Sequence, residues 1–282
     1  MDQASQAGTS SSPAIMARPI SVSTARSRPP PFDLSGLSRS AAALDLAMVV
    51  LVALLVPIGT EVAAGLFVAS DALTEFNWAI VADKWLDAVL VVGVTGYLVY
   101  RHGLSPTAFG LQREHWLRQV FWAVPTLCGV YAAFFALFLL VLAIALVAPQ
   151  IEHDLQRRTE FMEMLPLEDL SATVLLLIPV AIHEELLFRG LLIPYLHRLG
   201  CRWGTAIVLS AAIFGVLHLP QGWFGALQIF GVGIMLGLFF LISRSLLAVI
   251  IAHLLFNLVQ FQVARYMLPW LEEVAPAALS LP

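Results

Sequence analysis

Seven long apolar runs dominate this 282-residue chain and limit the folds open to it. A helix needs about 20 mostly apolar residues to cross a bilayer, and the runs are near or above that length. They cover residues 42–69, 79–100, 120–147, 171–196, 204–219, 223–242 and 245–267. The sequence therefore predicts an all-α fold, a polytopic membrane helix bundle. It should have seven transmembrane helices, or eight if the first run bends at Pro57.

Composition supports a membrane protein and excludes several other classes. The chain is 60% hydrophobic and 12% charged, whereas a soluble domain carries about a quarter charged residues. Its two cysteines, Cys128 and Cys201, form neither a disulfide framework nor a metal-ligand spacing. No basic cluster is interleaved with aromatic residues, so the lipid bilayer is an expected partner and nucleic acid is not.

The basic residues outside the spans predict the orientation, because cytoplasmic loops collect Lys and Arg. With the N-terminus in the cytoplasm, ten such residues fall on the inner side and four on the outer side. The inner ones are Arg18, Arg26, Arg28, Arg39, Arg101, Arg113, Arg118, Arg198, Arg202 and Arg244. The outer ones are Lys84, Arg157, Arg158 and Arg265. We expect an N-terminus in the cytoplasm and a protein of the bacterial inner (plasma) membrane.

The fourth run carries ionisable residues that are costly in lipid and usually mark a functional site. Glu184 and Glu185 are adjacent, and Arg189 follows Glu185 by four residues, so Glu185 and Arg189 share one helix face. Arg189 can neutralise one carboxylate and leave Glu184 in different surroundings, which is how paired carboxyl groups divide acid and base roles. The alternative is a buried ion pair with a structural role only.

Two later runs add polar pairs at the same spacing. Phe214 and His218 are four apart in the fifth run, and His253 and Asn257 are four apart in the seventh. All these groups could converge on one interior cavity. The alternatives are a histidine that packs near the end of a span and an asparagine that bonds a neighbouring helix. Glu184 lies near mid-span and His218 near a span end, so the fifth helix must tilt or begin later than Gly204.

Several hydrolase motifs are missing. Position 187 is Leu, so no H-E-x-x-H zinc helix follows His183, and no Ser lies in a G-x-S-x-G context. Neither cysteine neighbours a suitable base, and no Asp pair in facing spans suggests an aspartyl protease. The chemistry that remains is a carboxylate that activates water, with help from histidines and an amide.

The three polar motifs resemble those of the CPBP intramembrane proteases, the CAAX-protease and bacteriocin-processing (Abi) family. Glu184-Glu185-Leu-Leu-Phe-Arg189 is similar to the family's E-E-x-x-x-R. Phe214-Gly-Val-Leu-His218 is similar to its F-x-x-x-H, and His253-Leu-Leu-Phe-Asn257 to its H-x-x-x-N. The motifs come in the family's order, and the resemblance covers roughly residues 171–260.

The resemblance implies roles for these residues. Glu184 would be the general base for the hydrolytic water, with His218 as its partner, and His253 and Asn257 would stabilise the oxyanion. Glu185, Arg189 and Phe214 would support the site or bind substrate. No cofactor is required in this scheme. Zinc is the alternative, held by Glu184, His218 and His253 as a His₂Glu set.

The implied function is an intramembrane endopeptidase that cleaves near the C-terminus of a membrane-anchored, prenylated or precursor peptide. A non-catalytic scaffold or a bacteriocin self-immunity protein is the main alternative. A small transporter fits less well, because the two halves of the chain show no matched broken helices.

The chain divides into four expected regions. Residues 1–40 are rich in Ser, Pro and Arg and should form a disordered cytoplasmic tail, with a transit peptide as the alternative. Residues 41–170 hold the N-terminal transmembrane helices and loops, in which 151–169 is typical of an interfacial helix, a solvated loop or a substrate gate. Residues 171–268 form the CPBP-like catalytic core, and residues 269–282 are a C-terminal tail.

Overall fold

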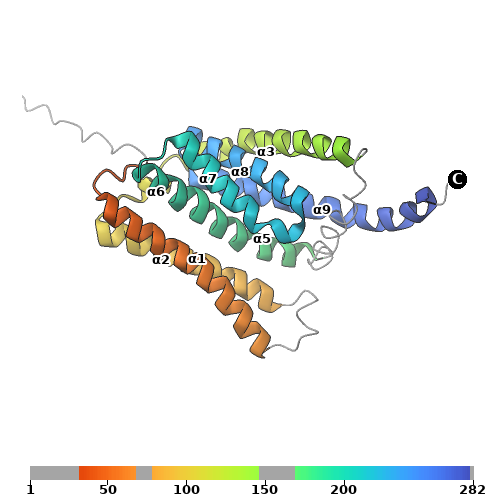
Figure 1. The fold of residues 1–282 in the computed structure, drawn as a ribbon, viewed down its shortest axis with the longest axis horizontal. Helices are drawn as coiled ribbons and strands as arrows, with labels where there is room; N and C mark the ends of the chain where they lie inside the picture. Colours follow the sequence, from red (N-terminus) through yellow and green to blue (C-terminus); the bar gives the residue numbers. More distant parts are fainter. Residues whose placement is uncertain (1–31, 68–77, 146–168, 280–282) are drawn as a thin grey trace, which may run out of the picture.

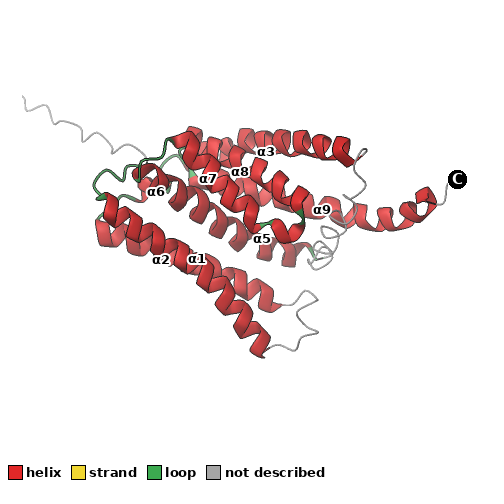
Figure 2. Cartoon of the chain, viewed as in Figure 1, coloured by secondary structure: helices red, strands yellow, loops and turns green. Residues whose placement is uncertain are grey.

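The computed structural model of the chain describes residues 32–67, 78–145 and 169–279 (Figure 1). Helices are the only regular elements in these ranges, and no strand occurs among them (Figure 2). The predicted all-α class is therefore confirmed for the described part of the chain. The segment 151–169, expected at the membrane interface, lies outside the described residues except for Asp169.

The helices follow the apolar runs of the sequence closely. The first three runs form α1 (Arg39–Phe67), α2 (Trp78–His102) and α3 (Trp116–Ala145). The fourth forms one continuous rod made of α5 (Leu170–Glu185), the π-helical segment η4 (Leu186–Leu192) and α6 (Ile193–Arg198). The last three form α7 (Trp203–Leu217), α8 (Trp223–Ser243) and α9 (Leu246–Leu279). Two short 3₁₀ turns are η2 (Pro106–Phe109) and η5 (Leu219–Gln221).

Four helices in the described residues are long and apolar enough to cross a bilayer, judged by length and composition. They are Trp116–Ile144, Leu170–Arg198, Trp223–Ser243 and Leu246–Tyr266. The chain is an integral membrane protein. The helix α1 continues through Pro57 as one element, and whether the chain has seven or eight spans is not decided by it. The count of seven spans stays a prediction.

The N-terminal end of the described chain is packed rather than free. Phe32 and Leu34, which the sequence assigns to the expected tail, are buried. The Phe32 ring lies 4.6 Å from that of Phe240 and 5.9 Å from that of Trp203, centroid to centroid. These apolar contacts hold residues 32–37 against the bundle. The rest of the tail expected over residues 1–40 lies mostly outside the described residues.

Successive helices alternate in direction. The starts of α1, α3, α7 and α9 and the ends of α2, α6 and α8 lie together at the left of Figure 1. We call this the basic end of the bundle, because Arg101, Arg198, Arg202 and Arg244 lie at those helix termini. All four belong to the segments predicted to face the cytoplasm. Which side of a membrane the basic end faces is still a prediction.

Small residues let α7 and α8 approach closely, as is common between membrane helices. A Cβ atom on Gly233 would lie 3.0 Å from the Ala211 side chain, and one on Gly215 would lie 3.0 Å from the Ala226 carbonyl. The helix α9 in turn packs against both α3 and α5. The helix α5 packs against α2 and α9, and the segment η4 that continues it contacts α1, α2, α7, α8 and α9.

Candidate active site

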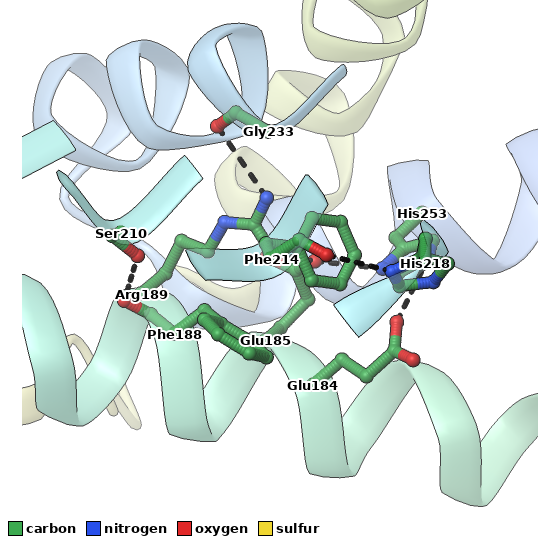
Figure 3. Close-up of polar contacts among 9 residues, drawn as sticks. All are labelled: Glu184, Glu185, Phe188, Arg189, Ser210, Phe214, His218, Gly233 and His253. Atoms are coloured by element: carbon green, nitrogen blue, oxygen red, sulfur yellow. Dashed lines mark hydrogen bonds and ion pairs between the residues drawn. The ribbon is translucent and has the colours of Figure 1, made fainter. Parts of the chain in front are cut away.

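The polar motifs of three helices meet around the junction between α5 and η4 (Figure 3). Glu184 and Glu185 are the last two residues of α5, and Arg189 lies within η4. Phe214 belongs to α7, His218 caps its C-terminus, and His253 belongs to α9. Residues more than 60 positions apart in the sequence therefore form one cluster.

Glu185 is the centre of a fully buried ion-pair network. Its Oε1 atom accepts a hydrogen bond from Arg189 Nη1 at 2.8 Å and lies 2.7 Å from His253 Nδ1. The exposed fraction of the side chain is 0% for Glu185 and 1% for Arg189. Arg189 Nη2 also donates to the Gly233 carbonyl of α8 at 3.4 Å. Buried charges need partners of this kind, because an unpaired charge inside a protein is strongly destabilising.

Glu184 has different surroundings. Its Oε2 atom lies 3.6 Å from His253 Nε2, and 19% of its side chain is exposed. His253 thus has a carboxylate at each ring nitrogen, Glu185 at Nδ1 and Glu184 at Nε2. The Glu185 carboxylate is buried and contacts two partners, whereas the Glu184 carboxylate remains accessible. This difference suits a structural role for Glu185 and a chemical role for Glu184.

Phe214 is the aromatic centre of the cluster. The Arg189 guanidinium lies over its ring at 4.7 Å from the centroid, a cation–π distance. The rings of His218 and His253 lie edge-on to it, with centroids 4.6 and 6.2 Å away. Phe214 is itself buried. One side chain therefore positions the arginine and both histidines.

His218 lies at the end of α7 and contacts its own helix. Its Nδ1 atom is 2.8 Å from the Phe214 carbonyl. A carbonyl can only accept, so Nδ1 is the donor in this contact, and in the neutral tautomer Nε2 is the acceptor. The structure joins Glu184 to His253, and the partnership of His218 with Glu184 stays a prediction. The helix α7 begins at Trp203, so the expected option of a start later than Gly204 is wrong, and its C-terminal end lies beside the cluster.

Asn257 lies one turn after His253 on α9 and is half-buried. Its amide makes no hydrogen bond to the glutamates or the histidines in this arrangement. Its expected role at an oxyanion therefore stays a prediction.

The π-helical segment is fixed from outside by a residue that no motif pointed to. The Phe188 carbonyl accepts the backbone amide of Ile193, a bond across five residues that defines the π turn. It also accepts the Ser210 hydroxyl from α7 at 2.9 Å. Ser210 and the Gly233 carbonyl are the two supporting groups missed by sequence reasoning. A lone serine and a backbone oxygen leave no sequence signal.

The three residues considered as zinc ligands from the sequence, Glu184, His218 and His253, are not arranged around a common point. Among the described residues, no group of three His, Cys, Asp or Glu side chains could hold a metal ion. His253 has both ring nitrogens directed to carboxylates, and the His218 nitrogen that remains free belongs to another helix. As the side chains lie, Glu184, His218 and His253 do not fit zinc.

The sequence of the helical core was compared with models of known protein families. The sequence model of the family described as type II CAAX prenyl endopeptidase Rce1-like matches residues 166–259. The chain carries an Rce1-like domain. This confirms the resemblance to the CPBP intramembrane proteases, and the Rce1-like domain contains every predicted site residue. The comparisons with curated proteins and with solved structures gave no match.

Proposed function

We propose that this protein is an intramembrane endopeptidase that uses Glu184 to activate water. The observation that carries the proposal is the unequal pair of carboxylates. Glu185 is sealed by Arg189 and His253, whereas Glu184 keeps an accessible carboxylate beside the same histidine. The Rce1-like domain supports a protease of the CAAX type.

In the proposed reaction, Glu184 takes a proton from water and the hydroxide attacks the carbonyl carbon of the scissile bond. The C–N bond then breaks, and the proton passes from Glu184 to the leaving amine. Proton transfer by a positioned side chain contributes typically ~10²–10⁴ in rate. No metal takes part in this scheme.

We propose a different role for His253 from the expected one of stabilising the oxyanion. It lies between both carboxylates, with Nδ1 2.7 Å from Glu185 Oε1 and Nε2 3.6 Å from Glu184 Oε2. His253 would then fix the orientation of Glu184. Asn257 would donate to the oxyanion of the substrate, which gains more from a donor in a dry site than in water. His218, whose Nδ1 donates to the Phe214 carbonyl, would offer Nε2 as an acceptor to the hydrolytic water.

The proposed substrate is a membrane-anchored, prenylated or precursor peptide cut near its C-terminus. We propose the bacterial inner membrane as its location, with the basic end in the cytoplasm. The test is purified full-length protein in liposomes, incubated with a farnesylated C-a-a-X peptide and its unprenylated twin, with products identified by mass spectrometry. A comparison of cellular protein C-termini with wild-type and Glu184→Gln protein covers other substrates.

We expect wild-type protein to release a C-terminal fragment and Glu184→Gln protein to release none. Cleavage at an equal rate by Glu184→Gln would overturn the mechanism. Identical C-termini in both cell lines, with no peptide cleaved in vitro, would instead favour a non-catalytic scaffold or self-immunity role.

A further inference from the structure

A groove of about 590 Å³ lies on the first turns of α3, away from the catalytic cluster. Its wall is formed by Trp116, Phe121, Trp122 and Pro125, and its rim carries Arg118. The Phe121 ring is 74% exposed and the Trp116 ring 60%. Pro125 has no N–H, so it also leaves the Phe121 backbone carbonyl without its usual helical donor. The groove is therefore aromatic along its length and polar at one end.

The loop beside the groove is held in place by side-chain hydrogen bonds. Gln119 is buried, and its Nε2 donates to the carbonyls of Gln112 and Glu114 at 3.0 and 2.9 Å. Its Oε1 accepts the Ser245 hydroxyl at 2.7 Å. The Gln112 side chain also donates to the Arg244 carbonyl. These bonds fix the loop before α3 to the turn between α8 and α9.

This network brings several cationic side chains to one place. Arg113, His115 and Arg118 are exposed on the loop and the first turn of α3, and Arg244 is exposed on the adjoining turn. Glu114 is the one acidic residue among positions 112–119. The groove therefore opens into a surface of net positive charge, at the basic end of the bundle.

The position of the groove indicates a lipid rather than the peptide substrate. Trp116 is the first residue of a candidate span, the level at which Trp side chains meet the headgroups of a bilayer. The helix α3 packs chiefly against α8 and α9, whereas both catalytic carboxylates lie on α5. An acyl chain can lie on the aromatic wall while a phosphate reaches the arginines.

We propose that this groove is a binding site for an anionic phospholipid. The phosphate pairs with Arg118, a headgroup hydroxyl donates to the Phe121 carbonyl, and the proximal acyl chain lies on Trp122 and Pro125. The site is independent of the peptidase reaction. Basic residues at a membrane surface each contribute about 1 kcal/mol toward anionic lipid, a factor of about five in affinity.

The test is native mass spectrometry of full-length detergent-solubilised protein, titrated with phosphatidylglycerol and with phosphatidylcholine of the same chains. We expect tighter binding of phosphatidylglycerol, an about fivefold loss in Arg118→Gln, and no loss in Arg265→Gln. Arg265 is the matched control, since it too lies beside an aromatic ring, that of Tyr266. Arg118 is exposed, so its substitution should leave the melting temperature unchanged.

A second variant distinguishes a specific binding site from attraction by net positive charge alone. Gln119→Ala removes no charge but frees the rim, and it should weaken phosphatidylglycerol binding in the same direction. Equal affinity for the two lipids, equal losses in Arg118→Gln and Arg265→Gln, or wild-type affinity in Gln119→Ala would each overturn the proposal. So would displacement of the lipid by a farnesylated peptide together with a raised KM in Arg118→Gln, because the occupant would then be the substrate.

Discussion

His253 Nδ1 lies 2.7 Å from Glu185 Oε1, the same oxygen that accepts the hydrogen bond of Arg189. A histidine of α9 is thereby tied to the carboxylate at the end of α5, 68 positions earlier in the chain. The same ring presents its other nitrogen to Glu184. The two glutamates are thus coupled through His253 and not through direct contact.

The first prediction follows from this coupling. His253→Ala should lower both turnover and the melting temperature, because it leaves Glu185 short of a partner inside the bundle. Breaking a buried pair typically costs ~3–5 kcal/mol. His218→Ala should lower turnover alone, since His218 is half-buried and contacts its own helix. Thermal unfolding in detergent and peptide cleavage measure the two effects. Equal melting temperatures in both variants would contradict this distinction.

The second prediction separates the two carboxylates. Glu184→Gln should abolish cleavage while the protein still inserts and purifies, because the amide keeps the shape and removes the base. Glu185→Gln should reduce the folded yield as well, since Arg189 then lacks its carboxylate in a fully buried position. Yield after gel filtration and turnover per folded protein are the readouts. Equal yields of the two variants would be the contrary result.

The third prediction concerns the π-helical segment. Ser210→Ala removes the hydroxyl that bonds the Phe188 carbonyl, and Thr126→Ala removes a similar bond to the Trp122 carbonyl at 2.7 Å. Each loss should cost about 1 kcal/mol of stability. Only Ser210→Ala should also lower kcat, because η4 carries Arg189 and adjoins both glutamates. A kcat unchanged in Ser210→Ala would mean that the segment does not need this support.

The fourth prediction tests the metal-free mechanism. Purified active protein should contain well under one metal ion per chain by elemental analysis, and chelators should leave turnover intact. Asn257→Ala should lower kcat by about 10²-fold with little change in KM, as expected for a donor used mainly in the transition state. Stoichiometric zinc that is lost together with turnover in His218→Ala would establish the metal mechanism instead.

The fifth prediction is the orientation. A reporter enzyme fused after Arg113 should be active in the cytoplasm, and one fused after Arg157 should be active outside. Arg113 belongs to the loop at the basic end of the bundle, and ten of the fourteen basic residues outside the spans were assigned to the inner side. Reporters on the same side would show that the number of spans between the two positions is even.

The helices and the contact between Glu185 and Arg189 follow from the sequence for different reasons. Hydropathy predicted each apolar run because a helix in lipid needs continuous apolar residues, and the helix bounds agree with the runs to within a few residues except at the C-terminal end of α9. The four-residue spacing predicted that Glu185 and Arg189 would meet, because both lie on one helix. No such rule relates residues on different helices.

The choice of histidine was therefore beyond sequence reasoning. Whether His218 or His253 reaches Glu184 depends on how α7 and α9 pack on α5, and this depends on small residues such as Gly233 and Gly215. The π turns after Glu185 add a second uncertainty. They change the rotation of every later residue on the helix, and Leu-Leu-Phe-Arg-Gly-Leu-Leu has no composition that distinguishes π from α.

The shortness of α7 has a consequence for the supply of water to the reaction. Its 15 residues reach about 22 Å, against about 30 Å for the apolar layer of a bilayer. The turn Leu219–Gln221 and the glycine after it then lie at a depth where lipid offers no hydrogen-bond partner to the peptide groups. Those groups must face protein or water, and a hydrated recess at the foot of α7 would open directly beside His218. The shortness of α7 would then give water, the second reactant, access to a peptide bond held within the membrane.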